Sequence, residues 1–183
     1  MISGQRPPPR DQALKKIFLL AFSIMLATDS SFAQSDYRLG SGDLISIVVF
    51  DEPELTMEVR VSKTPTTYPF LGQVALDDRN LAEVESQITE GLKGDYLIEP
   101  RVSISVIEYR PFFITGEVAS PGSYPYQLGL TLRKAITLGG GFTERASKSK
   151  IIVTRGGEGS EQRIQMSEPV FPDDVITIEQ SFF

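Results

Sequence analysis

The chain has 183 residues, a formal net charge of −6 at neutral pH, and neither histidine nor cysteine. The absence of both residue types removes the commonest general base, the usual zinc ligands and the thiolate nucleophile, and it leaves no disulfides. An acidic chain is also poorly suited to binding nucleic acid. We therefore predict no catalytic residues, no metal, no cofactor and no nucleic-acid partner.

The first 33 residues have the order of a secretory signal peptide. A basic lead over residues 6–16 precedes the apolar run 17-IFLLAFSIMLA-27, and small residues stand at Ser31 and Ala33, where a signal peptidase reads. Eleven apolar residues are too few for an uncleaved anchor across about 30 Å of hydrocarbon. We predict cleavage between Ala33 and Gln34. The leader carries four basic and two acidic residues, so cleavage leaves 150 residues with a net charge of −8.

The first part of the mature chain is predicted to be a β-β-α-β unit. Alternation of Ile45, Ile47 and Val49 predicts a strand over residues 44–50, and turn residues divide the following segments into short strands. The predicted elements are a re-entering strand within 51–61, short strands within 63–76, a helix over 80–96 and a strand over 100–109.

The predicted helix over 80–96 carries signals at both ends. Asn80 is a capping residue, and Glu83 follows three positions later as in a capping box. The apolar residues of this segment recur at helical spacing, and Gly94 ends the pattern. The alternating strand that follows is half-buried, so the helix is expected to cover one face of the sheet.

The second part of the chain is predicted to be a small sheet crossed by one short helix. A hairpin turns at 119-ASPG-122, and Thr131 caps a helix that the glycines 139–141 end. The predicted strands are 112–118, 123–127, 150–155, 162–166 and 175–179, with a glycine-rich turn over 156–160.

One phrase occurs near both ends of the mature chain. The stretches 42-GDLISI-47 and 173-DDVITI-178 share a turn, an aspartate and a strand that alternates around two isoleucines. Asp43 and Asp174 each stand where a turn enters a strand, and an aspartate there accepts a backbone N–H bond. We predict that both are structural, and that replacing either by alanine costs about 0.5–2 kcal/mol.

Few residues suggest chemistry of their own. The glycines 139–141 follow a helix, whereas a phosphate-binding loop precedes one, so a helix end is the better interpretation. Asp51 and Glu52 are adjacent acids of the kind a glycan hydrolase pairs, but neighbours on a strand face opposite sides. Among the aromatic residues, Tyr124 and Tyr126 are candidate sugar contacts, although such strand residues are more often core or hairpin pairs.

Taken in order, several motifs resemble the polysaccharide export proteins of Gram-negative bacteria. The first part is similar to the export domain, and the second to a soluble-ligand-binding β-grasp (SLBB) domain. The motifs are 37-YRLGSGDLISIVVFDEPEL-55, 69-PFLGQV-74, 81-LAEVESQITEGL-92 and 100-PRVSISVIEYR-110, then 114-ITGEVASPGSYPY-126, 130-LTLRKAITLGGGFTERA-146 and 172-PDDVITI-178. The family turns fall at Gly42, Asp43, Pro69, Gly72, Gly116, Pro121, Gly122, Gly139, Gly140, Gly141 and Asp174.

The resemblance implies an α+β protein with small mixed sheets each crossed by a helix. It divides the chain into a signal peptide (1–33), an export domain (34–110) and an SLBB-like β-grasp domain (111–183). It further implies an oligomeric subunit, secreted to the periplasm and associated with the outer membrane, that exports capsule or exopolysaccharide without catalysis. The implied partners are polysaccharide, further copies of the chain and an inner-membrane polysaccharide co-polymerase or export complex.

The chain also departs from larger family members. They attach a lipid at an N-terminal cysteine, carry further β-grasp modules and cross the outer membrane with a C-terminal helix, so we expect this chain not to be a lipoprotein or a channel by itself. We expect assembly through the strand edges of the β-grasp domain. The alternative is a monomeric periplasmic accessory that binds glycan or docks on the export complex.

Overall fold

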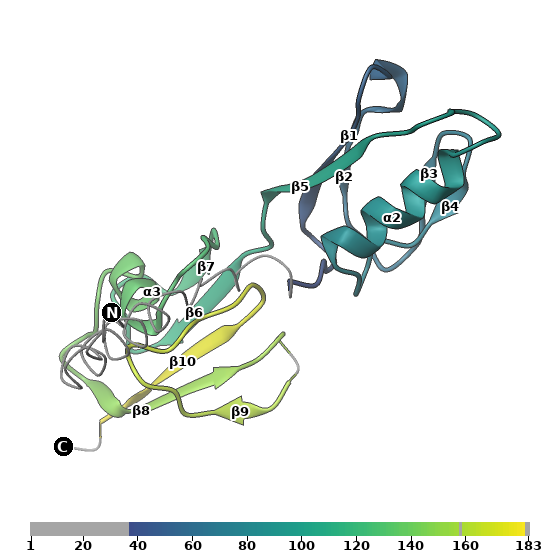
Figure 1. The fold of residues 1–183 in the computed structure, drawn as a ribbon. Coiled ribbons are helices and arrows are strands. Elements are labelled where there is room, and N and C mark those ends of the chain that lie inside the picture. Colours follow the sequence, from purple (N-terminus) through teal and green to yellow (C-terminus); the bar gives the residue numbers. More distant parts are fainter. Residues whose placement is uncertain (1–36, 158, 182–183) are drawn as a thin grey trace, which may run out of the picture. The chain divides into compact units, whose positions relative to one another are not determined.

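The computed structural model describes residues 37–157 and 159–181, and Figure 1 shows their arrangement. The predicted signal peptide and its cleavage site between Ala33 and Gln34 lie outside the described residues. Small mixed sheets accompanied by two helices confirm the α+β prediction. The elements are β1 (Leu44–Val49), the 3-10 helix η1 (Pro53–Leu55), β2 (Met57–Arg60), β3 (Thr66–Tyr68), β4 (Gly72–Val74), α2 (Leu81–Leu92), β5 (Val102–Glu108), β6 (Phe112–Gly116), β7 (Gly122–Tyr124), α3 (Leu132–Leu138), β8 (Ala146–Thr154), β9 (Glu161–Gln162) and β10 (Val175–Gln180).

The first sheet has the strand order β2-β1-β5, with β1 antiparallel to both neighbours. Ile45 and Ile47 of β1 and Ile104 of β5 are buried in one core with Val84 and Ile88 of α2. Burying each such side chain contributes about 1.5–3 kcal/mol. The alternation in β1 therefore fixes which face of the sheet the helix covers.

The predicted capping box at the start of α2 is confirmed. Asn80 Oδ1 accepts from the Glu83 N–H at 2.8 Å, and the Glu83 carboxylate accepts from the Asn80 N–H at 3.1 Å. These two bonds satisfy donors that an uncapped helix leaves free. The helix ends at Leu92, four residues before the predicted end, and Gly94 follows with a left-handed φ of 90°.

Strands β3 and β4 form a separate two-stranded hairpin, as the short-strand prediction for 63–76 required. Tyr68 is buried at the end of β3, and its hydroxyl donates to the Leu55 carbonyl oxygen at 2.7 Å. The hairpin is thus attached through one side chain to the turn that follows β1.

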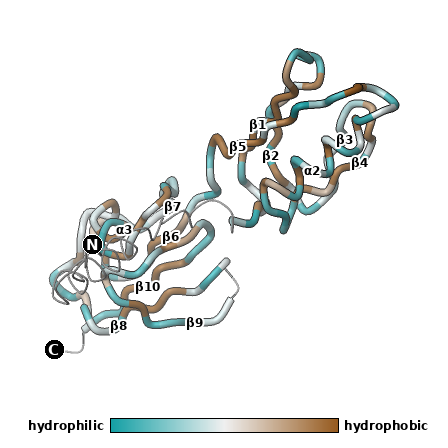
Figure 2. The backbone as a smooth tube through the Cα atoms, viewed as in Figure 1, coloured by the Kyte–Doolittle hydropathy of each residue, from teal (hydrophilic) through white to brown (hydrophobic). Residues whose placement is uncertain are grey.

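The second sheet has the order β7-β6-β10-β8-β9, in which β10 runs parallel to β6 and the other pairs are antiparallel. Figure 2 shows the apolar character of β6 and β10. Helix α3 covers one face of this sheet. The core it forms with the strands contains Phe112, Ile114, Leu132, Ala135, Ile136, Val153, Ile176 and Ile178.

The prediction of a strand over 162–166 is wrong beyond Gln162. The backbone after that residue instead provides hydrogen-bond acceptors to the first turn of helix α3. The N–H groups of Leu132 and Arg133, in the first turn of α3, donate to the carbonyls of Glu168 and Met166, both at 3.0 Å. Because the first N–H groups of a helix have no partner within it, these bonds compete with strand pairing. Strand β8, by contrast, begins at Ala146, four residues before the prediction.

Two glycines lie where another part of the chain comes so close that a Cβ atom would clash with it. Gly116 ends β6 with a φ of 86°, and a Cβ atom there would lie 2.0 Å from the Ile178 carbonyl oxygen. Gly40 lies under the Arg110 guanidinium, and its Cβ would come within 2.3 Å of an Arg110 nitrogen. At Gly116 the clashing atom is backbone, so the position excludes every other residue. At Gly40 a larger residue requires the end of the Arg110 side chain to move.

Within the residues the structure describes, no helix is both long and apolar enough to cross a bilayer.

Candidate functional site

The two repeated phrases fold into the same backbone turn. The N–H of each aspartate donates to the carbonyl oxygen three residues earlier, at 3.1 Å for Asp43 and 3.3 Å for Asp174. The third residue of each turn is left-handed, Gly42 at 110° and Asp173 at 67°. A positive φ at this position is typical of a type II turn. The sequence repeat is therefore a repeat of backbone conformation.

Asp43 is fully buried, and both of its carboxylate oxygens accept hydrogen bonds. Oδ2 accepts from the Tyr37 hydroxyl at 2.6 Å, the Gly40 N–H at 2.9 Å and the Arg110 guanidinium at 3.0 Å. Oδ1 accepts from the Arg110 N–H at 2.7 Å. Burial and the Asp43 carboxylate raise the pKa of Tyr37 above its ordinary value, so the phenol stays protonated and keeps donating.

Asp174 is also buried, but its carboxylate has fewer partners. Oδ2 accepts from the Phe171 N–H at 2.8 Å and from the Arg155 guanidinium, while Oδ1 has no hydrogen bond within the described residues. Burial raises the pKa of Asp174, although the Phe171 N–H, Arg155 and the nearby Gly156 N–H oppose that rise. The two aspartates share a turn and an arginine partner, but only Asp43 is fully satisfied.

Each turn also joins the start of its strand to a neighbouring segment. Gly42 N–H donates to the Val61 carbonyl and Val61 N–H to the Asp43 carbonyl, at 2.9 and 2.8 Å. In the second copy, Asp173 N–H donates to the Pro111 carbonyl and Phe113 N–H to the Asp174 carbonyl, both at 2.8 Å. Both carboxylates are closed to solvent and engaged in holding backbone, so this geometry favours a structural role over ligand binding.

An exposed aromatic pair lies in the first part of the chain. Phe70, in the β3–β4 turn, and Tyr96, after α2, have ring centroids 4.8 Å apart and planes tilted by 31°. Phe70 is 63% exposed and Tyr96 is 48% exposed, so about half or more of each residue faces solvent although the two rings contact each other. Phe70 has a φ of 64°, and the Leu71 N–H donates to the Pro69 carbonyl at 2.8 Å in the same turn.

The conformation of Phe70 is unfavourable for a bulky residue. A left-handed φ at a non-glycine residue costs about 1–3 kcal/mol, and such strain is concentrated at functional sites. The strain here holds an apolar ring in solvent against Tyr96. Sequence reasoning missed the pair because Phe70 lay within a predicted strand segment and Tyr96 at the end of the predicted helix. The turn signals Pro69 and Gly72 on either side of Phe70 were the available clue.

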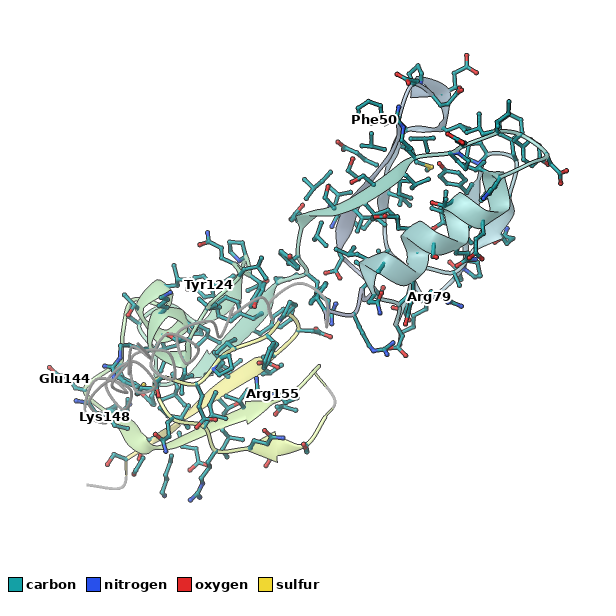
Figure 3. All side chains as sticks on the ribbon, in the orientation of Figure 1. Phe50, Arg79, Tyr124, Glu144, Lys148 and Arg155 are labelled. Atoms are coloured by element: carbon teal, nitrogen blue, oxygen red, sulfur yellow. The ribbon has the colours of Figure 1, made fainter. Side chains whose placement is uncertain are left out.

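The candidate sugar contacts Tyr124 and Tyr126 are only half exposed. Tyr124, labelled in Figure 3, packs on Phe112 with ring centroids 5.9 Å apart, and its hydroxyl donates to the Ser120 carbonyl. Burial raises the pKa of Tyr126. Both rings pack against the core of the second sheet. Their contact with sugar stays a prediction, and their packing favours the core and hairpin role.

The remaining family turn residues occupy loops and element ends. Gly139 caps α3, and Gly140 and Gly141 follow it with φ values of 81° and 85°. Pro121 and Gly122 form the entry into β7. The glycines therefore lie at the C-terminal end of a helix, where carbonyl groups rather than N–H groups are free.

Asp51 and Glu52 are not on a strand, so the expectation that they face opposite sides of a strand is wrong. Asp51 has a φ of 64° in the turn after β1, and Glu52 precedes η1. Asp51 instead forms an exposed ion pair with Arg101 at 3.5 Å. Among the described residues, no group of three or more acidic side chains is placed to hold a metal ion.

Two family models match successive segments of the chain. Residues 32–107 match the family model "Polysaccharide biosynthesis/export protein", and residues 111–165 match the model "SLBB domain". The chain is 30% identical over 166 residues to the exopolysaccharide production protein ExoF of Rhizobium meliloti, which covers 82% of this chain and 39% of that protein. It is 29% identical over 150 residues to the EPS I polysaccharide export outer membrane protein EpsA of Ralstonia nicotianae, covering 67% of this chain and 39% of that protein. The chain thus spans about two fifths of the length of these relatives.

Proposed function

Because the chain belongs to the polysaccharide export protein family, we propose that it is a subunit of a capsule or exopolysaccharide export system and has no catalytic role. The observation that carries the proposal is the presence of an export-domain match and an SLBB match in one chain, in that order. The relatives are themselves named for exopolysaccharide production and outer-membrane export. Periplasmic or outer-membrane association follows from the same relationship.

The proposed partners are polysaccharide, further copies of the chain and an inner-membrane polysaccharide co-polymerase or export complex. An export subunit need not hold reactive groups, because its work is to surround or guide a polymer. The buried, paired carboxylates of Asp43 and Asp174 agree with that role, since neither is available to a substrate.

Deletion and complementation in the native host test this proposal. We expect deletion to lower secreted polysaccharide while polymer remains in the cell envelope, and expression of the full chain to restore secretion. The length distribution of residual polymer should be unchanged, because a non-catalytic subunit cuts and joins no bonds. Normal secretion in the deletion strain, or polymer of altered length with normal secretion, would contradict the proposal.

The exposed Phe70–Tyr96 pair favours a second candidate function, that of a glycan-binding accessory. Sugar rings present C–H groups that pack on aromatic faces, and two adjacent rings form a platform of suitable chemistry. Phe70 is held in solvent at a conformational cost, and such strain is concentrated at functional sites. In this function the chain would hold the polymer beside the export complex.

Binding of the host's purified exopolysaccharide by the full chain tests the aromatic platform. Aromatic packing contributes about 0.5–1.5 kcal/mol, so Phe70→Ala or Tyr96→Ala should weaken binding about twofold to twelvefold. Phe50→Ala is the matched control, because Phe50 (labelled in Figure 3) is 62% exposed in the same part of the chain. Its ring lies under the Arg101 guanidinium. Equal loss in all three variants would refute a specific platform, and no binding by the wild-type chain would refute the accessory function.

A further inference from the structure

Strand β5 has one edge without a partner. It is the last strand in the order β2-β1-β5, and within the described residues no strand pairs with its outer side. The Phe50 N–H donates to the Arg101 carbonyl at 2.9 Å, so the backbone groups of Arg101 point toward β1. Since bonding directions alternate along a strand, residues 101, 103 and 105 face β1. The N–H and C=O groups of Val102, Ile104 and Val106 therefore point toward the open edge.

This edge differs from the other sheet edges of the described chain. In the second sheet the edge strands β9 and β7 have two and three residues, and β2 has four residues that include Glu58 and Arg60. Strand β5 has seven residues, and its first six contain neither a charge nor a proline. Proteins usually protect edges with short strands, charges or proline. The edge of β5 lacks all three, whereas the β-grasp edges expected to mediate assembly are short.

A β-bulge sets the length of the usable edge. The pairing of β5 with β1 shifts by one residue between Leu44 and Ile45, which places the extra residue at Ile107. A bulge bends its strand and interrupts a ladder. The regular part of the edge is thus 102–106, and its midpoint is Ile104. An antiparallel pair of two such edges would be centred on this residue.

In that register, the side chains of this segment match those of the same segment in a second copy. Ile104 would stand opposite Ile104 of a second copy, and Val102 opposite Val106, which joins the apolar rows on the helix-covered face. Ser103 would stand opposite Ser105 on the other face. Val102 and Val106 are only partly buried in the single chain, and Ser103 and Ser105 are exposed. No charged residue opposes a like charge in this segment.

We propose that two copies of this chain associate about a two-fold axis by antiparallel pairing of β5 with β5, in the register that places Ser103 opposite Ser105. The pairing forms one six-stranded sheet from two three-stranded sheets. A two-fold contact uses the same surface on both copies, as this self-complementary edge does. The proposed contact depends on β5 alone and does not depend on the export function.

Cysteine cross-linking of the full chain tests the register. The chain has no cysteine of its own, so introduced thiols are unambiguous. Residues 103 and 105 would form a non-hydrogen-bonded pair with Cα atoms about 4.5 Å apart, which is within disulfide range. Oxidising a mixture of Ser103→Cys and Ser105→Cys chains should give at least tenfold more disulfide-linked dimer than oxidising either variant alone. Equal yields from the mixture and the single variants would overturn the register.

Charge variants test the association itself by light scattering. Ser103→Lys with Ser105→Lys places like charges opposite each other and should convert dimer to monomer. Ser103→Lys with Ser105→Glu places opposite charges there and should restore the dimer. Circular dichroism of both variants checks that these exposed substitutions leave the fold intact. A wild-type chain that stays monomeric at tens of micromolar, or a dimer indifferent to the paired lysines, would overturn the proposal.

Discussion

Replacing Asp43 by alanine should destabilise the first part of the chain more than its sequence suggests. The turn chemistry alone predicts a loss of about 0.5–2 kcal/mol, as for a capping carboxylate. The structure gives this carboxylate four donors, namely the Tyr37 hydroxyl, the Gly40 N–H, and the N–H and guanidinium of Arg110. Asp43 therefore holds together the start of β1, the turn before it and the segment that follows β5.

The size of the loss follows from what the substitution leaves behind. A buried donor without a partner costs about 1–3 kcal/mol, and removing one member of a buried ion pair costs about 3–5 kcal/mol. The Arg110 side chain is 20% exposed and regains part of its hydration, while the Gly40 and Arg110 N–H groups are only partly buried. We therefore expect Asp43→Ala to lower the free energy of unfolding by about 3–5 kcal/mol.

Hydrogen exchange with peptide-level mass spectrometry measures this loss where it occurs. Asp43→Ala should accelerate exchange in peptides that cover β1 and β2, and leave peptides that cover β10 unchanged. Glu108→Ala is the control, because its ion pair with Arg60 is exposed and contributes about 0–1 kcal/mol. A loss no greater than that of Glu108→Ala would show that the four hydrogen bonds to Asp43 contribute little to the stability of the fold.

Three further predictions concern other positions. Because burial raises the pKa of Asp174 above its ordinary 3.8, its contribution to stability is full below about pH 4 and declines as pH rises through the raised pKa. The stability of wild type relative to Asp174→Asn should thus fall from pH 4 to pH 7 in urea unfolding, and a rise would contradict the burial argument. Gly116→Ala should cost about 2–3 kcal/mol from its left-handed φ and the clash with Ile178, whereas Gly122→Ala, with open space around it, should be near neutral by thermal unfolding. Asn80→Ala should cost about 0.5–2 kcal/mol and speed exchange in the first turn of α2, and unchanged exchange there would refute the capping box.

Periodicity and turn residues predicted most of the elements because their signals are local. Alternation at Ile45 and Ile47, and helical spacing at Val84 and Ile88, each reflect one face that must be buried against the other. The strand predicted over 162–166 was wrong because its competitor lies far along the chain. The Arg133 N–H at the start of α3 donates to the carbonyl of Met166, inside the predicted strand, and the Leu132 N–H donates to the carbonyl of Glu168 just after it. The residues of the segment itself give no sign of these distant donors.

The two aspartate phrases show how far a repeated sequence determines a repeated site. Each of the two phrases predicts its turn, because the left-handed third residue and the aspartate that accepts the hydrogen bond lie within the same four residues. Neither predicts its arginine, because Arg110 is 67 residues from Asp43 and Arg155 is 19 residues from Asp174. The partners decide the energetics, and they make Asp43 fully paired while Asp174 keeps one oxygen unbonded. The same phrase thus starts two strands with equal geometry and unequal stability, so Asp43→Ala should cost more than Asp174→Ala in a direct comparison.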